Sequence, residues 1–302
     1  MDYSESSPPL RALAYIIFGA AMVSFTSVLV EVAHVGATAT AFYRMFFGGI
    51  ILFGITLVRG DRIWLGIKSL GIPLLCAFLF SLDLFFWHRS INFVGPGLAT
   101  ILGNMQVFFV ALFAVWFLKE KLGWRLMVAI PFAVLGLFLI VRTGWGQQGG
   151  AVKLGVLYGL LTALSYALYI LILRKSQTTG QKLQYSLIPN MAWVSLLSAL
   201  LLGITVLVEP HAHFVIPDLQ TWGALIGLGI MGQVLGWVCI SKGLPKVDAS
   251  IGGLALLLQP ALALMWDILF FGRPTTALEY VGAAVVLGAI YLGSTKSKKG
   301  DS

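Results

Sequence analysis

Two ionisable residues stand inside a long apolar run, where a charged group is costly to place. On insertion scales a carboxylate at the centre of a membrane helix costs about 2.5–3.5 kcal/mol, so it usually faces a protein interior or a water-filled cavity. Asp83 could exchange protons or bind an amine there, and a hydrogen-bonded packing residue is the alternative. His88 could titrate near neutrality, but it lies off the helical stripe of Asp83, and a residue at the mouth of a cavity is its alternative.

Uncharged amides recur in similar apolar runs, at Asn104, Gln106, Gln233 and Gln259. Gln106 and Gln259 each lie ten or eleven residues from the start of their run, about 15 Å along a helix that rises ~1.5 Å per residue. An amide at that depth could bind the polar ends of a zwitterion, or it could join two helices by a hydrogen bond worth about 0.6 kcal/mol. Both interpretations stay open for each amide.

One arginine and several large aromatic residues lie in these runs as well. Arg44 is roughly 10 Å from the end of its run, and we expect its long side chain to carry the charge out to the interface. Aromatic walls that include Tyr166 and Trp237 could stack on an aromatic solute or attract a planar cation. Ordinary packing is the alternative for each ring.

The elements that must position these residues are ten apolar stretches. A hydrocarbon core ~30 Å thick needs ~20 helical residues per crossing, and backbone amides in lipid must be satisfied within their own segment, so we expect membrane helices. Only 11% of the 302 residues are charged, against ~25% in a soluble domain. The expected spans are Arg11–Val30, Ala37–Val58, Ser69–Ile91, Pro96–Leu118, Gly123–Val141, Val152–Leu173, Tyr185–Val208, Leu219–Ser241, Asp248–Phe271 and Ala277–Gly293.

Basic residues predict the direction of the spans. With the amino terminus inside, the cytoplasmic segments carry fifteen Lys and Arg residues and the outer loops carry four. This bias predicts that both termini are cytoplasmic. The four outer residues are Arg89, Arg142, Lys153 and Arg273.

A glycine-rich outer loop, Arg142–Lys153, divides the spans into two sets of five. Because five is odd, the second set must enter the membrane inverted, and inverted repeats place a substrate site near the midplane where the halves meet. We therefore expect one repeat at residues 11–142, an inverted one at 152–293, and a cytoplasmic tail at 294–302. A shift of 153 residues aligns Gln106 with Gln259, although sequence identity adds little to the repeat.

Three stretches carry a resemblance to a known family. They are the arginine in FYRMFFGG (Arg44), the segment GLATILGNMQVFFVALFAVWFLKEKL that ends in Glu120 and Lys121, and the mid-span Pro260. With its two sets of five spans, nearly the whole chain resembles the drug/metabolite transporter superfamily, which is built from paired EamA domains. Within it, the chain looks most like the bacterial aromatic amino acid and methyl viologen exporters. Three positions depart from the symmetric pattern: Val107, Asn190 and Arg273.

The resemblance implies an all-α bundle of ten helices around a central cavity lined mainly by the first, third, fourth, sixth, eighth and ninth spans. The candidate residues on those spans, for substrate binding or coupling, are Asp83, His88, Asn104, Gln106, Tyr166, Gln233, Trp237 and Gln259. Cys76 and Cys239 are expected to be inert thiols, and neither a metal site nor a cofactor is implied.

We expect an inner-membrane exporter of small metabolites, most of all aromatic or other apolar amino acids, that works by alternating access. Coupling to protons and uncoupled exchange both stay open. Export of cationic drugs is an alternative, and so is a nucleotide-sugar carrier, which would want several buried cations. An enzyme is disfavoured because the chain has no HExxH or G-x-S-x-G motif, and non-saturating flux would indicate a channel. The partners expected are a small solute and the lipid bilayer, without nucleic acid, and a monomer is compatible with the sequence.

Overall fold

The computed structural model describes residues 8–63, 67–141, 152–183, 186–209, 212–272 and 274–294, and the regular secondary structure within these ranges is helical throughout. Residues 142–151 of the expected outer loop Arg142–Lys153, Arg273 and tail residues 295–302 lie outside them. The helices are α1 (Pro8–Glu31), α2 (Ala37–Val58), α3 (Ile67–Asn104), α4 (Gln106–Leu118), α5 (Trp124–Val141), α6 (Val152–Leu183), α7 (Leu187–Val208), α8 (Leu219–Leu228), the π-helix η2 (Gly229–Trp237), α9 (Val238–Gly243), the 3-10 helix η3 (Leu244–Lys246), α10 (Ala249–Ala255), α11 (Leu258–Phe271) and α12 (Ala277–Ser294).

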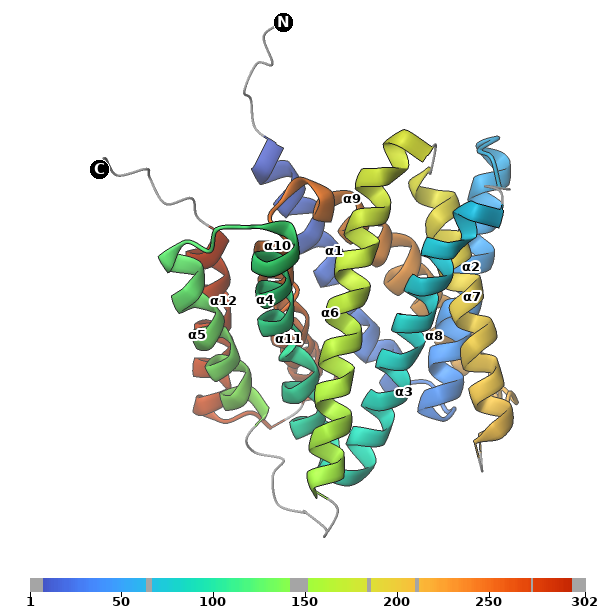
Figure 1. Cartoon of the computed structure of the whole chain (residues 1–302). Helices are drawn as coiled ribbons and strands as arrows, with labels where there is room; N and C mark the ends of the chain where they lie inside the picture. Colours follow the sequence, from blue (N-terminus) through green and yellow to red (C-terminus); the bar gives the residue numbers. More distant parts are fainter. Residues whose placement is uncertain are drawn as a thin grey trace, which may run out of the picture.

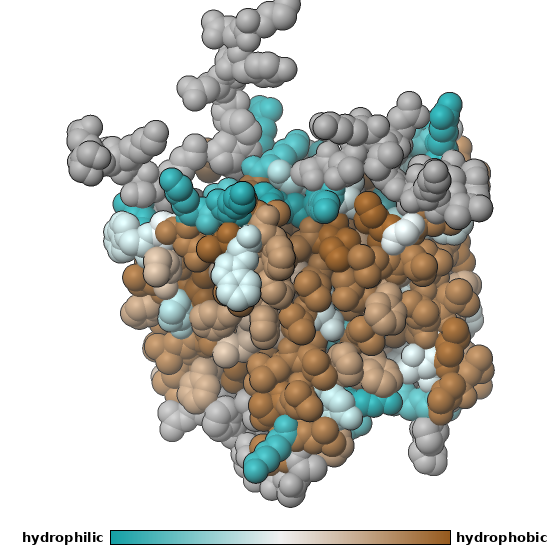
Figure 2. All heavy atoms as spheres, viewed as in Figure 1, coloured by the Kyte–Doolittle hydropathy of each residue, from teal (hydrophilic) through white to brown (hydrophobic). Residues whose placement is uncertain are grey.

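The helices run side by side in one bundle, with the start of α1 and the finish of α12 at the same end (Figure 1). We call this the terminal end and the opposite one the distal end. Eight helical segments among the described residues are long and apolar enough to cross a membrane, and two shorter apolar helices, Trp124–Ile140 and Ala277–Gly293, accompany them. Figure 2 shows the resulting apolar belt between two hydrophilic ends. The prediction of an all-helical membrane protein is confirmed.

The predicted boundary between the third and fourth spans lies within the residues of α3. The backbone stays helical through this boundary, but the chain reverses its direction there. Thr162 of α6 donates its hydroxyl to the carbonyl of Asp83 at 3.4 Å, and a Cβ on Gly103 would lie 3.2 Å from the Thr162 methyl. Asp83 and Gly103 therefore flank the same level of α6. About two turns from Thr162, toward the start of α6, a Cβ on Gly155 would lie 2.5 Å from Val94. The chain of α3 therefore runs along α6 from Asp83 to Val94, reverses, and runs back to Gly103.

Glycines let several helices approach backbone to backbone, as small residues do in membranes. A Cβ on Gly136 of α5 would lie 2.7 Å from the carbonyl oxygen of Gly282 in α12. A Cβ on Gly19 of α1 would lie 2.6 Å from the carbonyl oxygen of Gly236 in η2. No larger residue fits these positions without moving a helix.

The fourth and ninth predicted spans are both interrupted near their middle, within two residues of a glutamine. The first interruption, at Met105, separates α3 from α4, which begins at Gln106. The second, at Leu256–Leu257, separates α10 from α11 and precedes Gln259 and Pro260. Proline cannot donate to the carbonyl one turn back, and here the N–H of Gln259 takes the Leu256 carbonyl at 3.1 Å instead. The interruption of the ninth span therefore lies one turn before Pro260.

The eighth predicted span is not a uniform α-helix, because its centre is the π-helix η2. Gly229, Gly232 and Gly236 lie in this segment and face other helices. A π-helical turn adds a residue to each turn, redirects the side chains that follow, and is often found at functional sites. The wider turn brings Trp237 to a fully buried position.

One ion pair ties four elements together at the terminal end. Arg174 of α6 lies 3.3 Å from Glu120, just after α4, and it donates to the carbonyls of Leu244 and Val247 at 3.1 and 2.7 Å. Glu120 accepts hydrogen bonds from Ser250 Oγ at 2.8 Å and from the first backbone N–H groups of α10. Both charged side chains are largely buried, at 18% and 12% exposure. This Glu120–Arg174 clamp holds α4, α6, η3 and α10 together.

Candidate functional site

Four rings from three elements form an aromatic cluster inside the bundle: Phe80 of α3, Tyr166 and Tyr169 of α6, and Trp237 of η2. Tyr166 and Tyr169 are three residues apart and share one helix face. The ring centroids of Tyr169 lie 4.9 Å from Trp237 and 4.8 Å from Phe80, and Tyr166 meets Trp237 edge-on at 6.1 Å. The two aromatic residues predicted for the site therefore lie together, in a wall that a planar solute could use.

Arg44 of α2 does not carry its charge out to the interface, so that expectation is wrong. Its Nε is buried and has no hydrogen-bond partner among the described residues. A Cβ on Gly232 of η2 would lie 2.8 Å from this Nε, so the missing side chain at Gly232 makes the room that the guanidinium occupies. Arg44 lies near Tyr166 and Tyr169 of the aromatic cluster.

Asp83 of α3 supplies a carboxyl group beside this guanidinium. It is buried, at 8% exposure, and it lies near Arg44 and Tyr166. Within the described ranges, the two charged groups make no ion pair. A guanidinium and a carboxyl group thus share the interior of the bundle without contact, where electrostatic interactions are stronger than in water.

Hydrogen-bond donors without an acceptor gather around this pair. Within the part of the chain that the structure describes, the buried Arg44 Nε, Tyr169 hydroxyl, Trp237 Nε1 and Gln259 Nε2 have no partner. The Gln259 amide lies near the Tyr166 hydroxyl, which places α11 beside the aromatic cluster. Buried polar groups are normally hydrogen-bonded, so an unusual surplus of donors indicates a place for an acceptor such as a carboxylate.

The other predicted amides have partners that hold helices together. Gln106 donates from Nε2 to the Gly253 carbonyl of α10 at 3.1 Å. Gln233 donates to Ser195 Oγ of α7 at 3.2 Å. Asn104 donates to the Thr100 carbonyl of its own helix at 2.8 Å, where it competes with the backbone beside the interruption of α3.

The structure separates His88 from this central set. Its ring lies 5.2 Å from that of Trp87, and its electrostatic neighbours are Glu209 of α7 and Arg89, toward the distal end. The predicted residues that come together are therefore Asp83, Tyr166, Trp237 and Gln259.

The prediction of the site missed Arg44, Tyr169 and Phe80. Tyr169 could have been found from its spacing to Tyr166, since residues three apart share a face. The inward position of Arg44 depends on a glycine 188 positions later, which no local pattern contains.

A model of the EamA-like transporter family matches residues 10–142 and 153–295. The chain belongs to this family. It is a multi-pass membrane protein with two EamA domains, and its function is transport rather than catalysis. The resemblance inferred from the sequence is confirmed at this level.

Several relatives are similar along their whole length. An uncharacterized transporter of Archaeoglobus fulgidus is 21% identical over 282 residues, 92% of this chain and 94% of the relative. The pseudopaline exporter CntI of Pseudomonas aeruginosa is 24% identical over 303 residues, 99% of either chain. A solved crystal structure with 16% identity superimposes with a TM-score of 0.78 over 96% of both chains, which shows that the fold is shared.

Proposed function

We propose that this protein exports aromatic or other apolar amino acids across the bacterial inner membrane, by alternating access around a central site. The observation that carries the proposal is the combination of Arg44 and Asp83, two buried opposite charges without an ion pair, beside the aromatic cluster.

A zwitterion satisfies both charges at once. Its carboxylate would accept hydrogen bonds from Arg44 and from the donors that lack a partner, and its ammonium group would face Asp83. Its aromatic side chain would pack on Tyr166 and Trp237. A solute with only one charge would leave the opposite group buried and uncompensated, which is costly.

The proposed topology has ten spans in two inverted repeats, with cytoplasmic termini. Fifteen basic residues against four support this orientation, which makes the terminal end cytoplasmic. The packing supports the repeat. The second span packs on the seventh (α2 on α7), the fifth on the tenth (α5 on α12) and the fourth on the ninth (α4 on α10). The third packs on the sixth as the eighth packs on the first, which is the pattern that a twofold pseudo-symmetry requires.

Two alternatives differ in the solute. A cationic drug would suit Asp83 and the aromatic cluster, but it would leave Arg44 without an anion. Export of pseudopaline is the second candidate, supported by the full-length similarity to the Pseudomonas exporter.

Counterflow in proteoliposomes tests the proposal. Vesicles loaded with unlabelled phenylalanine should accumulate labelled phenylalanine saturably, and unlabelled tryptophan should compete. Phenethylamine and 3-phenylpropanoate, which each lack one charge, should compete poorly. Arg44→Gln and Asp83→Asn should each abolish accumulation while the protein stays monodisperse. Folded protein that does not accumulate phenylalanine would overturn the proposal, and accumulation from pseudopaline-loaded vesicles alone would favour the second candidate.

A further inference from the structure

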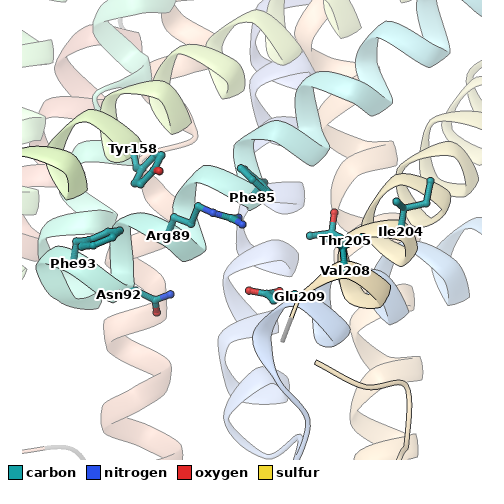
Figure 3. A pocket seen from close by; sticks show the side chains of 9 residues that line it. All are labelled: Phe85, Arg89, Asn92, Phe93, Tyr158, Ile204, Thr205, Val208 and Glu209. Carbon is teal, nitrogen blue, oxygen red and sulfur yellow. The ribbon is translucent and has the colours of Figure 1, made fainter. Parts of the chain in front are cut away.

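A cavity of about 540 Å³ lies at the distal end, between α3, α6 and α7 (Figure 3). Phe85 and Phe93 of α3 and Tyr158 of α6 line one side of it. The rings of Phe93 and Tyr158 stack at 5.9 Å between centroids. The volume is typical of small-molecule sites, which occupy roughly 300–1,000 Å³.

Two opposite charges face each other across this cavity. In Figure 3 the guanidinium of Arg89, on α3, and the carboxylate of Glu209, after α7, point toward one another. They make no ion pair in the described part of the chain. The Arg89 guanidinium carbon lies 3.4 Å from the centre of the Phe85 ring, and Glu209 accepts a hydrogen bond from Thr38 Oγ1 at 2.6 Å.

These contacts hold the two charges apart and in place. A guanidinium stacked on a ring keeps its N–H groups in the plane, free to form a two-pronged contact with a carboxylate. The hydrogen bond from Thr38 occupies one site of the Glu209 carboxylate, and the remaining lone pairs can accept from an ammonium group.

We propose that this distal cavity is a second binding site, for zwitterions with an aromatic or apolar side chain, which bind there after they leave the central site. The carboxylate binds Arg89, the ammonium group binds Glu209, and the side chain packs between Phe93 and Tyr158. The ligand class is that of the proposed function, on which this step rests. The site itself uses none of the residues of the central one.

Protection of an engineered thiol tests the site directly. Thr205, on the α7 side of the cavity, is replaced by cysteine, and the full-length protein in lipid nanodiscs reacts with a maleimide. Phenylalanine should slow the labelling of Thr205→Cys severalfold and saturably, whereas phenethylamine and 3-phenylpropanoate should not. Val215→Cys, on an exposed loop outside the cavity, should label at the same rate with and without phenylalanine. Labelling of the wild-type protein measures the background reaction of the two native thiols, Cys76 and Cys239.

Additional variants in the Thr205→Cys background separate the two sites. Arg89→Gln or Glu209→Gln should each remove the protection, and Arg44→Gln should leave it intact. Protection lost with Arg44→Gln but kept with Arg89→Gln would overturn the inference, because the thiol would then report a change that starts at the central site. Absence of protection in every variant would overturn it too, as would labelling slowed by phosphatidylethanolamine lipid and not by phenylalanine. Protection that persists where counterflow fails would contradict the proposed function alone.

Discussion

The charged residues of the Glu120–Arg174 clamp and those of the central and distal sites are arranged in opposite ways. In the Glu120–Arg174 clamp, cation and anion are in contact at 3.3 Å, and backbone groups complete their hydrogen bonds. Arg44 and Asp83 at the centre share a site without an ion pair, and so do Arg89 and Glu209 at the distal end. Charges that the protein itself satisfies stabilise one conformation, and charges that it holds apart are available to a solute.

Under the proposed alternating access, this difference is expected of a conformation that is open at the distal end. The clamp closes the terminal end, which the proposed topology makes cytoplasmic, and the described cavity lies at the opposite end. Alternating access then requires the clamp to break when the protein opens toward the cytoplasm. Four comparisons of variants separate residues that stabilise the fold from residues that are available to a solute.

The largest effect on stability is expected in the clamp. Glu120→Gln leaves Arg174 without its carboxylate, and breaking a buried pair costs about 3 kcal/mol, or roughly 5–10 °C in apparent Tm. Glu209→Gln removes a carboxylate that makes no ion pair and should shift the apparent Tm by less than about 2 °C. Thermal unfolding of the purified variants measures both, and equal shifts would break the comparison.

The second-largest effect is expected at Gly232, where the missing side chain leaves space for the Arg44 guanidinium. Gly232→Ala places a Cβ 2.8 Å from Arg44 Nε and should displace the guanidinium. Phenylalanine counterflow should fall roughly tenfold, which corresponds to about 1.4 kcal/mol of lost binding. Gly223→Ala is the control, because a Cβ there meets nothing within 4 Å. Wild-type counterflow in Gly232→Ala would contradict the assignment of Arg44 to the site.

The two glutamines that follow the helix interruptions should differ in kind. Gln106→Leu leaves the buried Gly253 carbonyl without its donor, which costs about 1–2 kcal/mol of stability. Gln259 has no acceptor for its Nε2, so Gln259→Leu should leave the apparent Tm unchanged and raise the half-saturation concentration of phenylalanine a few-fold. If both variants lost only stability, Gln259 would be a packing residue as well.

The smallest effect is expected at an exposed pair of the distal end. Asp218 lies 2.7 Å from His34 Nδ1 and accepts the N–H of Thr221 at 2.7 Å. The hydrogen bond with His34, then that with Thr221, lowers the pKa of Asp218 to about 2, below the ~3.9 of an unfolded aspartate. The stabilisation is therefore present above about pH 4 and is lost as the pH falls through about 2.

The apparent Tm of wild type should exceed that of Asp218→Asn by a small, constant amount between pH 7 and pH 5. The difference should shrink below about pH 4. A difference that already vanishes between pH 7 and pH 6 would contradict this account, because Asp218 does not titrate there.

Local physics predicted the features that depend on one segment at a time. Span length and apolarity predicted the membrane helices and the reversal between the third and fourth spans. The π-helix η2 was not predictable in this way, because it depends on packing against α1 and α2.

The site was predictable only in part for the same reason. Asp83 stands out because a carboxylate is costly in a membrane span and usually has a functional role there. Gln259 stands out because it lies near the middle of its span. Which amide joins helices and which faces the site depends on distant partners such as Gly253 and Ser195. Arg44 was placed wrongly because its room comes from Gly232, on another helix.

The most direct test of alternating access is to lock the terminal end. The Ser250 hydroxyl donates to the Glu120 carboxylate at 2.8 Å, so the double variant Glu120→Cys/Ser250→Cys places one thiol on each side of the clamp, and the fraction that mild oxidation crosslinks is the locked form. Counterflow of labelled phenylalanine should stop in the oxidised protein and return with dithiothreitol, while Glu120→Cys alone should respond to neither reagent. Crosslinked protein that exchanges phenylalanine as fast as the reduced form would contradict the account.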